Sequence, residues 1–482
     1  SAAIYGDSGG NGVILVTTKK GKAGKTVTTF TAEAGVSDVI NKIDLMNTEQ
    51  WLGVVEEMRP GTEAYTTNID TFENYDWQDI MFQPALTQNY QFNTSGGNDN
   101  SNFFASASYL KEEGIVKNSD FERFIFRINS NHKLTKRISF DQKVSYINRE
   151  NLGMPSWQWN QYYDGPIRNG LIMPPNVPAY NPDRDGDNFN EWGISEYARV
   201  NPIAALDMEN RVEKDNVFKA NVGLQIEIIK GLTFTSRIAG TMSITDTKEY
   251  EDAYYSSVYD YRNENEVKLI ANMDKFMNYT AQELLQYDFS IAESHNFSTL
   301  AGIEFYREWG YGYNGERFMA PNLPDYLQYF TISSDEESIQ QIIDSDIPPE
   351  ERDFSFLARL NYDFKGKYLV TSNFRYSGSS THGPDYRWGA FPSFSAGWKF
   401  SEEEFVKDLG FLSFGKLRYG YGQVGANAPA GYPYLSIVRN LETLGYPYDN
   451  SVASPGAAPI KVSNPEIHWE TIHMSNFGID LA

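Results

Sequence analysis

Oxygen-bearing side chains recur at alternate positions in one acidic segment of the chain. They are Asn181, Asp183, Asp185, Asp187 and Glu191. Such spacing, with Gly186 at the sixth position for the turn, is typical of a loop that binds calcium. The segment departs from the EF-hand pattern because Asn opens it and the last acid stands at position eleven, before Trp192. The segment is therefore a candidate calcium site, and calcium is the only cofactor that the sequence suggests. The alternative interpretation is a solvated acidic turn in a surface loop.

Aromatic side chains form a second group that could bind a ligand. Both clusters are expected in loops, and they are Trp157, Trp159, Tyr162 and Tyr163, followed by Trp309, Tyr311 and Tyr313. Aromatic faces beside amides and carboxylates stack against sugar rings or peptide side chains. Packing between loops, and the aromatic girdle of a membrane barrel, explain the same residues equally well. We favour residues 157–163 as a substrate contact, because a girdle does not need four aromatics in seven residues.

Catalytic chemistry has little support in this sequence. The absence of Cys excludes a disulfide scaffold, a thiolate metal site and a cysteine nucleophile. His468 and His473 fall on opposite faces of a predicted strand, so a shared metal is not expected. Gly420–Gly425 matches a dinucleotide-binding pattern, but the stretch after it opens no helix, which favours a strand that ends there. No acid–base pair or nucleophile stands out, so we expect no enzyme.

The elements that must position these residues are β-strands. In Val217–Ile228, apolar and polar residues alternate, so that one face is apolar and the other is wet. The apolar face carries Phe218, Ala220, Val222, Leu224 and Ile226, and the polar face carries Lys219 and Gln225. Phe354–Phe364 repeats the pattern, with Arg359 and Asn361 on its polar face. We count about fourteen such strands, and we expect helices only in short pieces, chiefly Thr48–Met58 and Ser401–Asp408.

Short turns alternate with long connections along the chain. The turns fall near 97–101, 134–137, 230–231, 293–296 and 364–367, and the long connections fall near 38–85, 151–210, 248–275, 312–351 and 425–466. Short turns at one end and long loops at the other are typical of a transmembrane barrel. No stretch approaches the roughly 20 apolar residues of a membrane helix, and no propeller repeat is found. We therefore predict an all-β fold, a transmembrane antiparallel β-barrel.

Negative charge is concentrated in the long connections. The chain has a net charge of −23, and the first four long connections hold 34 acidic and 10 basic residues. Taken together the short turns lean basic instead, with Lys136, Arg137, Lys230, Lys365 and Lys367. This contrast fits a molecule with two distinct rims, although loops in general tolerate charge. So acidic a chain repels phosphate, and nucleic acid is not expected as a partner.

A series of short motifs extends from one end of the chain to the other. The series is Ser1–Gly6, Asn11–Gly21, Ser95–Gly97, Glu113–Val116, Ser119–Arg123, Arg387–Ser393, Gly397–Trp398, Lys416–Arg418, Tyr421–Gln423, Asn464–Pro465 and Trp469–Thr471. In content and order it resembles the SusC/RagA family of TonB-dependent outer-membrane transporters. One departure is Asp7–Gly10, where the family usually has Ser-Arg-Ala-Ala, and it concerns the anchoring of the plug domain.

The resemblance implies a domain organisation. Residues 1–24 would be the C-terminal end of a plug domain, and residues 25–482 the N-terminal two-thirds of a barrel of about 22 strands, with about 14 of them present. The plug segment contains Asn11, Gly12, Val13, Ile14, Leu15 and Val16. We expect it to form a strand inside the barrel, because Val13–Val16 lacks alternation, as a strand buried on both faces does. The TonB box, most of the plug and the last strands would lie outside this chain.

The resemblance also implies a function. We expect an importer of oligosaccharides in the outer membrane of a Gram-negative bacterium, driven by TonB and covered by a SusD-like surface lipoprotein. The barrel would contact lipid and lipopolysaccharide, and the loops 151–210 and 312–351 would line its extracellular mouth. The alternatives are a peptide importer of the RagA type, a passive porin and a soluble sugar-binding β-protein. The plug segment argues against the porin, whose lumen is open.

Overall fold

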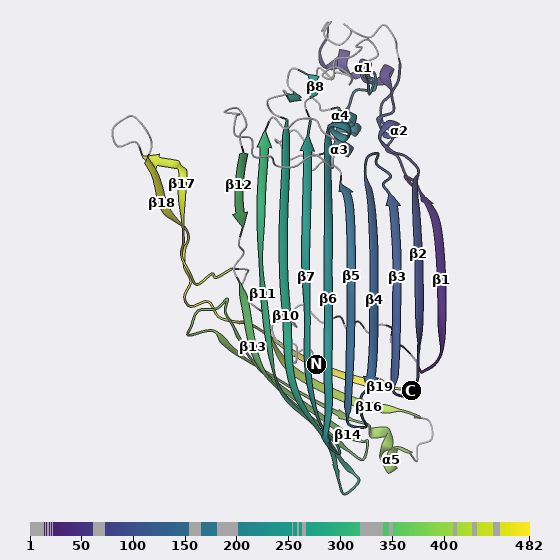
Figure 1. Cartoon of the computed structure of the whole chain (residues 1–482), viewed down its shortest axis with the longest axis vertical. Helices are drawn as coiled ribbons and strands as arrows, with labels where there is room; N and C mark the ends of the chain where they lie inside the picture. The colour runs from purple at the N-terminus through teal and green to yellow at the C-terminus, as the bar shows by residue number, and fades with distance from the viewer. Residues whose placement is uncertain are drawn as a thin grey trace.

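Strands make up most of the chain (Figure 1). A computed structural model describes residues 14, 16, 19, 21, 23–60, 73–153, 165–180, 201–252, 254–257, 260–262, 267–318, 341–346, 350–407, 412–426, 431–446 and 454–482. Among the helices in these ranges, none is long and apolar enough to cross a membrane.

The main sheet follows the order of the chain. Its antiparallel path consists of β1 (Gly24–Ser37), β2 (Ala85–Gly97), β3 (Ser101–Glu113), β4 (Asp120–Lys133), β5 (Ile138–Gly153), β6 (Glu209–Ile229), β7 (Leu232–Glu251), β10 (Lys268–Ile291), β11 (His295–Phe318), β13 (Glu351–Phe364), β14 (Tyr368–Ser379), β15 (Trp388–Trp398), β16 (Gly415–Ala426) and β19 (Glu470–Leu481). The fourteen strands of this path confirm the number predicted, and β12 (Gln341–Asp346) pairs beside β11. Two further hairpins are β8 (Tyr254–Ser257) with β9 (Asp260–Arg262), and β17 (Ile437–Tyr446) with β18 (Ser454–Lys461).

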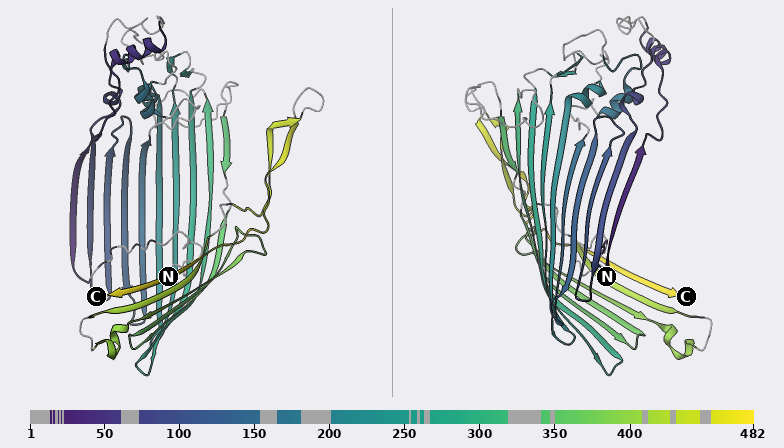
Figure 2. Two further views of the ribbon diagram at one scale, coloured as in Figure 1. Left: turned by 180° about the vertical axis from the view of Figure 1, so that it is seen from behind. Right: turned by 45° about the vertical axis from the view of Figure 1, so that its right-hand side comes forward.

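The sheet forms a bent wall. In Figure 2, β1 to β7, β10 and β11 stand side by side, whereas β13 to β16 and β19 turn away from them at an angle. The short turns lie at the lower end of the tall strands in Figure 1, and the long connections lie at the upper end. This separation of short turns from long loops is the one predicted from the sequence.

Two of the predicted connections are shorter than expected. β7 and β10 extend into the segment 248–275, and β11 extends to Phe318, beyond the predicted start of the loop 312–351. The β10–β11 ladder is continuous from the pair Lys268–Phe318 to the pair Ile291–His295. Backbone pairing therefore holds these segments extended even where polar residues on both faces hide the alternation.

Helices gather above the strands that the long connections join. α1 (Thr48–Met58) has the predicted bounds, and a capping box formed by Asn47 and Gln50 sets its start. Three shorter helices, α2 (Trp77–Met81), α3 (Pro166–Ile172) and α4 (Pro202–Met208), bury a small apolar core. The core contains Trp77, Met81, Val116, Met173, Ile203 and Leu206. It ties the segments before β2 and β6 to the upper end of the wall.

The helix predicted over Ser401–Asp408 is only partly formed. The structure has a 3₁₀ turn, η5 (Phe400–Glu402), followed by a single α turn, α5 (Glu404–Lys407). Glu403 between them is extended, and its carboxylate accepts hydrogen bonds from the Tyr368 hydroxyl at 2.7 Å and the Trp398 indole at 3.2 Å. These tertiary contacts hold Glu403 outside a helix that local pattern alone would continue.

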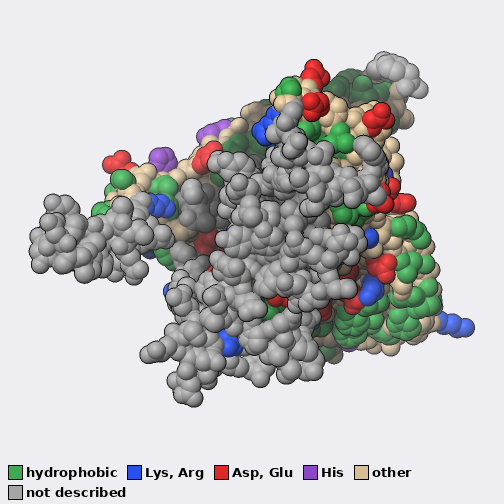
Figure 3. Space-filling model, turned by 90° about the horizontal axis from the view of Figure 1, so that it is seen from above, with side chains coloured by type: hydrophobic (Ala, Val, Ile, Leu, Met, Phe, Trp, Pro, Cys, Tyr) green, Lys and Arg blue, Asp and Glu red, His purple; other side chains and the backbone are tan. Residues whose placement is uncertain are grey.

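The two faces of the main sheet differ in character. Cross-strand partners form an apolar row through Phe92, Ala107, Phe126, Tyr146, Phe218 and Met242. Phe92, Phe126 and Phe218 have 46%, 40% and 43% of their surface exposed. Figure 3 shows hydrophobic side chains gathered on the right-hand outer side of the wall. An exposed row of this size suits contact with lipid better than contact with water.

The alternation predicted for individual strands is confirmed. Phe218 lies in the apolar row, whereas Lys219 lines a cavity on the opposite, polar face. Gln225 lies on the same polar face as Lys219, because an even number of residues separates them along β6. In β13, Phe356 and Leu360 are exposed on the apolar face. On the polar face of the same strand, Arg359 donates to the amide oxygen of Asn373 at 2.8 Å.

The apolar face allows a direct test with a matched pair of variants. Leu224 lies near the middle of the apolar run Phe218–Ile228, and Gln225 is its neighbour on the polar face. If the apolar face meets lipid, Leu224→Arg lowers the free energy of unfolding in lipid vesicles by about 2–4 kcal/mol near the midplane. Gln225→Arg, the control, has a much smaller effect. Equal losses in urea-unfolding curves would contradict the assignment of the two faces.

Candidate functional site

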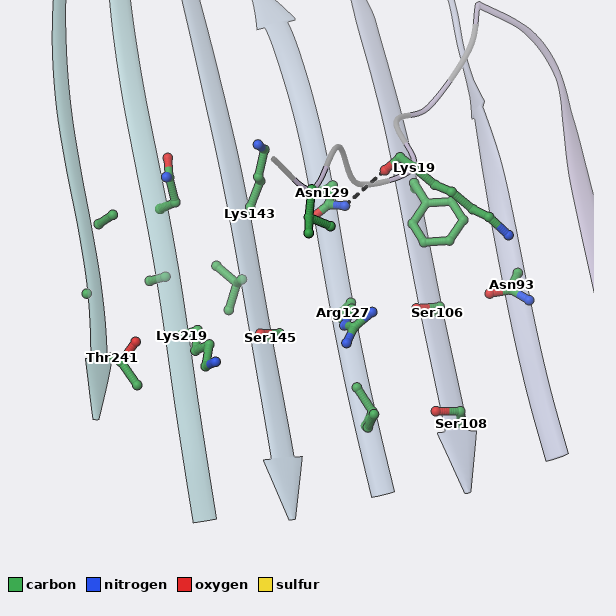
Figure 4. A pocket seen from close by; sticks show the side chains of 18 of the residues that line it. Lys19, Asn93, Ser106, Ser108, Arg127, Asn129, Lys143, Ser145, Lys219 and Thr241 are labelled. Atoms are coloured by element: carbon green, nitrogen blue, oxygen red, sulfur yellow. Dashed lines mark hydrogen bonds between the residues drawn. The ribbon is translucent and has the colours of Figure 1, made fainter. Parts of the chain in front are cut away.

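A cavity of about 900 Å³ lies on the polar face of the sheet. Strands β2 to β7 and β10 form its wall, and the N-terminal segment closes part of it through Val16 and Lys19. Figure 4 shows the labelled side chains of the neighbouring strands β2 to β7 pointing toward the same space. Their hydroxyl and amide groups include Asn93, Ser106, Ser108, Ser145 and Thr241. The lining can therefore make many hydrogen bonds to a polar ligand.

The N-terminal segment lies against the polar face and outside the wall itself. The Asn129 amide donates to the Lys19 carbonyl oxygen at 3.1 Å (Figure 4). Gly21 approaches β3 so closely that an added Cβ would lie 2.3 Å from the Phe103 carbonyl oxygen. Only a glycine allows this contact between two backbones. The segment therefore lies on the polar side of the wall and is not one of its strands.

The expected strand is not seen in the described part of this segment. Ile14, Val16, Lys19 and Gly21 are outside any strand, and Ile14 and Val16 are 92% and 77% exposed. The described residues place no second strand beside these two, and burial of this apolar run on both faces stays a prediction. Asn11, Gly12, Val13 and Leu15 lie outside the described residues.

Farther along the polar face, charged groups are paired. The Arg375 guanidinium binds the Glu304 carboxylate at 2.7 Å and donates to the Ser355 and Ser377 hydroxyls at 2.9 and 2.8 Å. Gln282 donates to the other oxygen of Glu304. A charge this well buried is stable only when its hydrogen bonds are satisfied. This network therefore serves to hold β10, β11, β13 and β14 in register.

An aromatic cluster closes the upper ends of β14, β15 and β19. The His382 ring stacks on the Trp469 ring with centroids 4.4 Å apart, and Phe391 meets the same indole edge-on at 5.6 Å. Burial and, to a smaller extent, the nearby His468 lower the pKa of His382. The ring is therefore neutral at neutral pH, and it acts as a packing group between two upper connections.

Ion pairs also gather where β11 and β13 begin to separate. Glu350, just before β13, binds the guanidinium groups of Arg352 and Arg307, the latter at 2.6 Å. Hydrogen bonds from Arg352 and from Arg307 lower the pKa of Glu350 to about 2. The carboxylate is therefore ionised at any physiological pH and holds the two strand ends together.

The second predicted aromatic cluster lies in a strand and not in a loop. Trp309, Tyr311 and Tyr313 belong to strand β11, which corrects their assignment to a loop. By their odd positions they lie on the apolar face, opposite Glu304 and the cavity. Trp309 contacts Tyr279 edge-on at 6.0 Å, and the Arg307 guanidinium lies 4.6 Å from its ring. The reason is the length of the β10–β11 ladder, and this placement favours the girdle interpretation.

The other predicted site residues lie outside the described residues. They are Trp157, Trp159, Tyr162 and Tyr163, and the calcium candidates Asn181, Asp183, Asp185, Asp187 and Glu191. Within the described ranges, no cluster of three or more His, Asp or Glu side chains could hold a metal ion. The glycine-rich Gly420–Gly425 lies in strand β16, as predicted.

Sequence reasoning missed most of the cations that line the cavity. Arg123, Arg127 and Lys143 join Lys19 and Lys219 there. Each of the three stands at a polar-face position of its strand, so the alternation already contained the signal. What was missing was the register that aligns β4, β5 and β6, because strand alternation does not say which residues become neighbours.

Comparison with known proteins places this architecture in a class. No protein-family model matches the chain. The TonB-dependent receptor P39 of Formosa agariphila is 30% identical over 505 residues, which cover 100% of this chain and 44% of that receptor. The TonB-dependent receptor SusC of Bacteroides thetaiotaomicron is 26% identical over 100% of this chain and 48% of its own length. The chain thus spans about half the length of these relatives.

A solved structure shows the same fold. The RagAB peptide transporter matches with a TM-score of 0.82 and 21% identity, covering 100% of this chain and 55% of the matched chain. The fold is therefore the β-barrel of TonB-dependent receptors, with fourteen strands of its wall in one path. Within that class, the chain is a SusC/RagA-type TonB-dependent transporter sequence that covers part of the length of its relatives.

The contact between Gly21 and Phe103 predicts how the N-terminal segment is held. Gly21→Val forces the segment away from β3, so trypsin should cleave after Lys19 and Lys20 several-fold faster in the folded full-length receptor. Gly53→Val, on helix α1 and away from the sheet edge, is the matched control, because no atom lies within 4 Å of the Cβ position at Gly53. Equal cleavage rates in the two variants would show that the segment is not docked on the wall.

Proposed function

We propose that the whole protein imports oligosaccharides across the outer membrane of a Gram-negative bacterium, with energy supplied through TonB. The observation that carries this proposal is the N-terminal segment lying across the polar face of the wall, held by Asn129 and Gly21. A segment in that position obstructs a lumen, and an obstructed lumen needs an energised step to open. A passive porin has no use for it, and an enzyme would need groups that the described site does not bring together.

The choice of a glycan as substrate rests on the sequence relatives. Identity to SusC is 26%, whereas the match to the RagAB peptide transporter, at 21%, carries the fold alone. The polar lining of hydroxyls and amides suits the ring hydroxyls of a sugar. A peptide importer of the RagA type is the second candidate, because the same hydroxyl and amide lining can also hydrogen-bond to peptide groups.

Partners and surroundings follow from the same proposal. The exposed apolar row faces lipid and lipopolysaccharide. The long connections at the upper end form the extracellular mouth, where a SusD-like surface lipoprotein sits as a lid. TonB acts on the N-terminal side of residues 1–24, which form the end of the plug domain, while residues 25–482 form the barrel.

The proposed function is tested by uptake in cells. Deleting the gene for the full-length receptor should abolish uptake of a labelled oligosaccharide that supports growth of the parent strain. A protonophore should do the same in the parent strain, because transport depends on energy from the inner membrane. Uptake that persists in the protonophore would indicate a porin. Loss of peptide uptake with glycan uptake unchanged would favour the second candidate.

The aromatic and acidic loop 151–210 is proposed to touch the substrate first. Trp157→Ala with Trp159→Ala should weaken oligosaccharide binding by about tenfold, because each aromatic ring buries a large area at low entropic cost. A calcium chelator should weaken binding too if Asp183, Asp185 and Asp187 hold an ion that stiffens the loop. Trp309→Phe, on the apolar face, is the control and should leave binding unchanged. Unchanged binding in the double variant would leave these residues a packing role only.

A further inference from the structure

The cavity on the polar face is unusual for its charge. Five cations line it, namely Lys19, Arg123, Arg127, Lys143 and Lys219. Among its described lining residues there is no Asp or Glu, although the whole chain carries a net charge of −23. Positive charge is therefore gathered at one place in an otherwise acidic protein.

These cations also lack the partners that other wall cations have. In the part of the chain that the structure describes, none of the five forms an ion pair, and the Arg123 Nε is buried with no hydrogen-bond partner. By contrast, Arg149 binds Asp215 at 2.6 Å and Arg237 binds Asp141 at 3.6 Å on neighbouring strands. The sheet thus neutralises its cations on either side of the cavity and leaves those within it unneutralised.

The register brings two of these cations to opposite sides of one small residue. Arg127 pairs across the strands with Ser145, and Ser145 pairs with Lys219. Neighbouring strands lie about 4.8 Å apart, so the two cationic residues start about 10 Å apart on the same face. Figure 4 shows their side chains entering the same space as Lys143. This spacing suits one anionic group held between a guanidinium and an ammonium group.

Like charges held this close repel one another, and an anion that enters between them relieves the repulsion. A neutral sugar supplies hydroxyl groups but no such counter-charge. The cavity volume of about 900 Å³ lies within the range of small-ligand sites, about 300–1,000 Å³. The lining therefore fits a ligand that combines ring hydroxyls with a carboxylate or a sulfate.

We propose that this cavity is a binding station for the anionic groups, carboxylate or sulfate, of an acidic oligosaccharide during its passage through the barrel. The inference rests on the proposed import of glycans and narrows the substrate to the acidic class. Arg127 and Lys219 hold the anionic group, and Lys19 brings a further cation from the N-terminal segment. When that segment moves, the site loses one of its charges, and the hold on the ligand weakens.

The test uses the purified full-length receptor in detergent and needs no energy source, so it does not depend on transport. Two probe pairs are compared by calorimetry: tetragalacturonate with its methyl ester, and a sulfated oligosaccharide with its desulfated form. The acidic member of at least one pair should bind at least tenfold more tightly. Arg127→Gln with Lys219→Gln should weaken that binding by about tenfold to a hundredfold and leave the neutral member unchanged. Lys136→Gln with Lys230→Gln, in the short turns, makes the same change in net charge and should have no effect.

Three results would overturn the proposal. In the first, neither acidic probe binds more tightly than its neutral partner. In the second, both double variants weaken the acidic probe equally, which indicates a general charge effect. In the third, Arg127→Gln with Lys219→Gln lowers the melting temperature of the receptor but does not change the ratio of affinities for the acidic and neutral probes. That result would mean that the two cations pair with a carboxylate of the plug and not with a ligand. Normal binding together with failed uptake would contradict only the proposed function.

Discussion

The antiparallel backbone ladder is the constraint on which the rest of this structure depends. Every strand of the main path pairs with its neighbours in a defined register, and successive side chains must point to opposite faces. A slip of one residue in β6 would carry Lys219 to the apolar face and Phe218 to the cavity. The lipid-facing row and the polar cavity are therefore two consequences of the same hydrogen bonds.

The two ends of the wall differ in how the strands are connected. At the lower end, turns such as 134–137 and 230–231 do little more than join strands. At the upper end, long connections fold into helices around Trp77 and Met81, and the His382–Trp469 stack joins two further connections. Packing at this end gives the connections a fixed base, so that loops above it can differ without disturbing the strands.

The local arrangement of charged groups in this protein matters more for ligand binding and strand pairing than the net charge of the chain. The net charge is −23, yet the polar face contains a cationic cavity and a paired network around Arg375, and Glu350 is neutralised by two arginines near the upper end of β11 and β13. Pairing stabilises the wall where strands must hold their register, whereas unpaired groups remain available to a ligand. A total charge alone would have suggested that anions are excluded everywhere.

Features that depend on near neighbours in the chain could be predicted from the sequence by itself. The alternation in Val217–Ile228, the start of α1 at Asn47 and the separation of short turns from long connections are all local, and the barrel wall followed from them. Tertiary structure alone decided that Glu403 interrupts a helix, that β11 continues through Trp309 and Tyr313, and that cations from positions 19 to 219 share one cavity. Those outcomes depend on cross-strand register and on contacts between distant segments, which alternation within one strand does not encode.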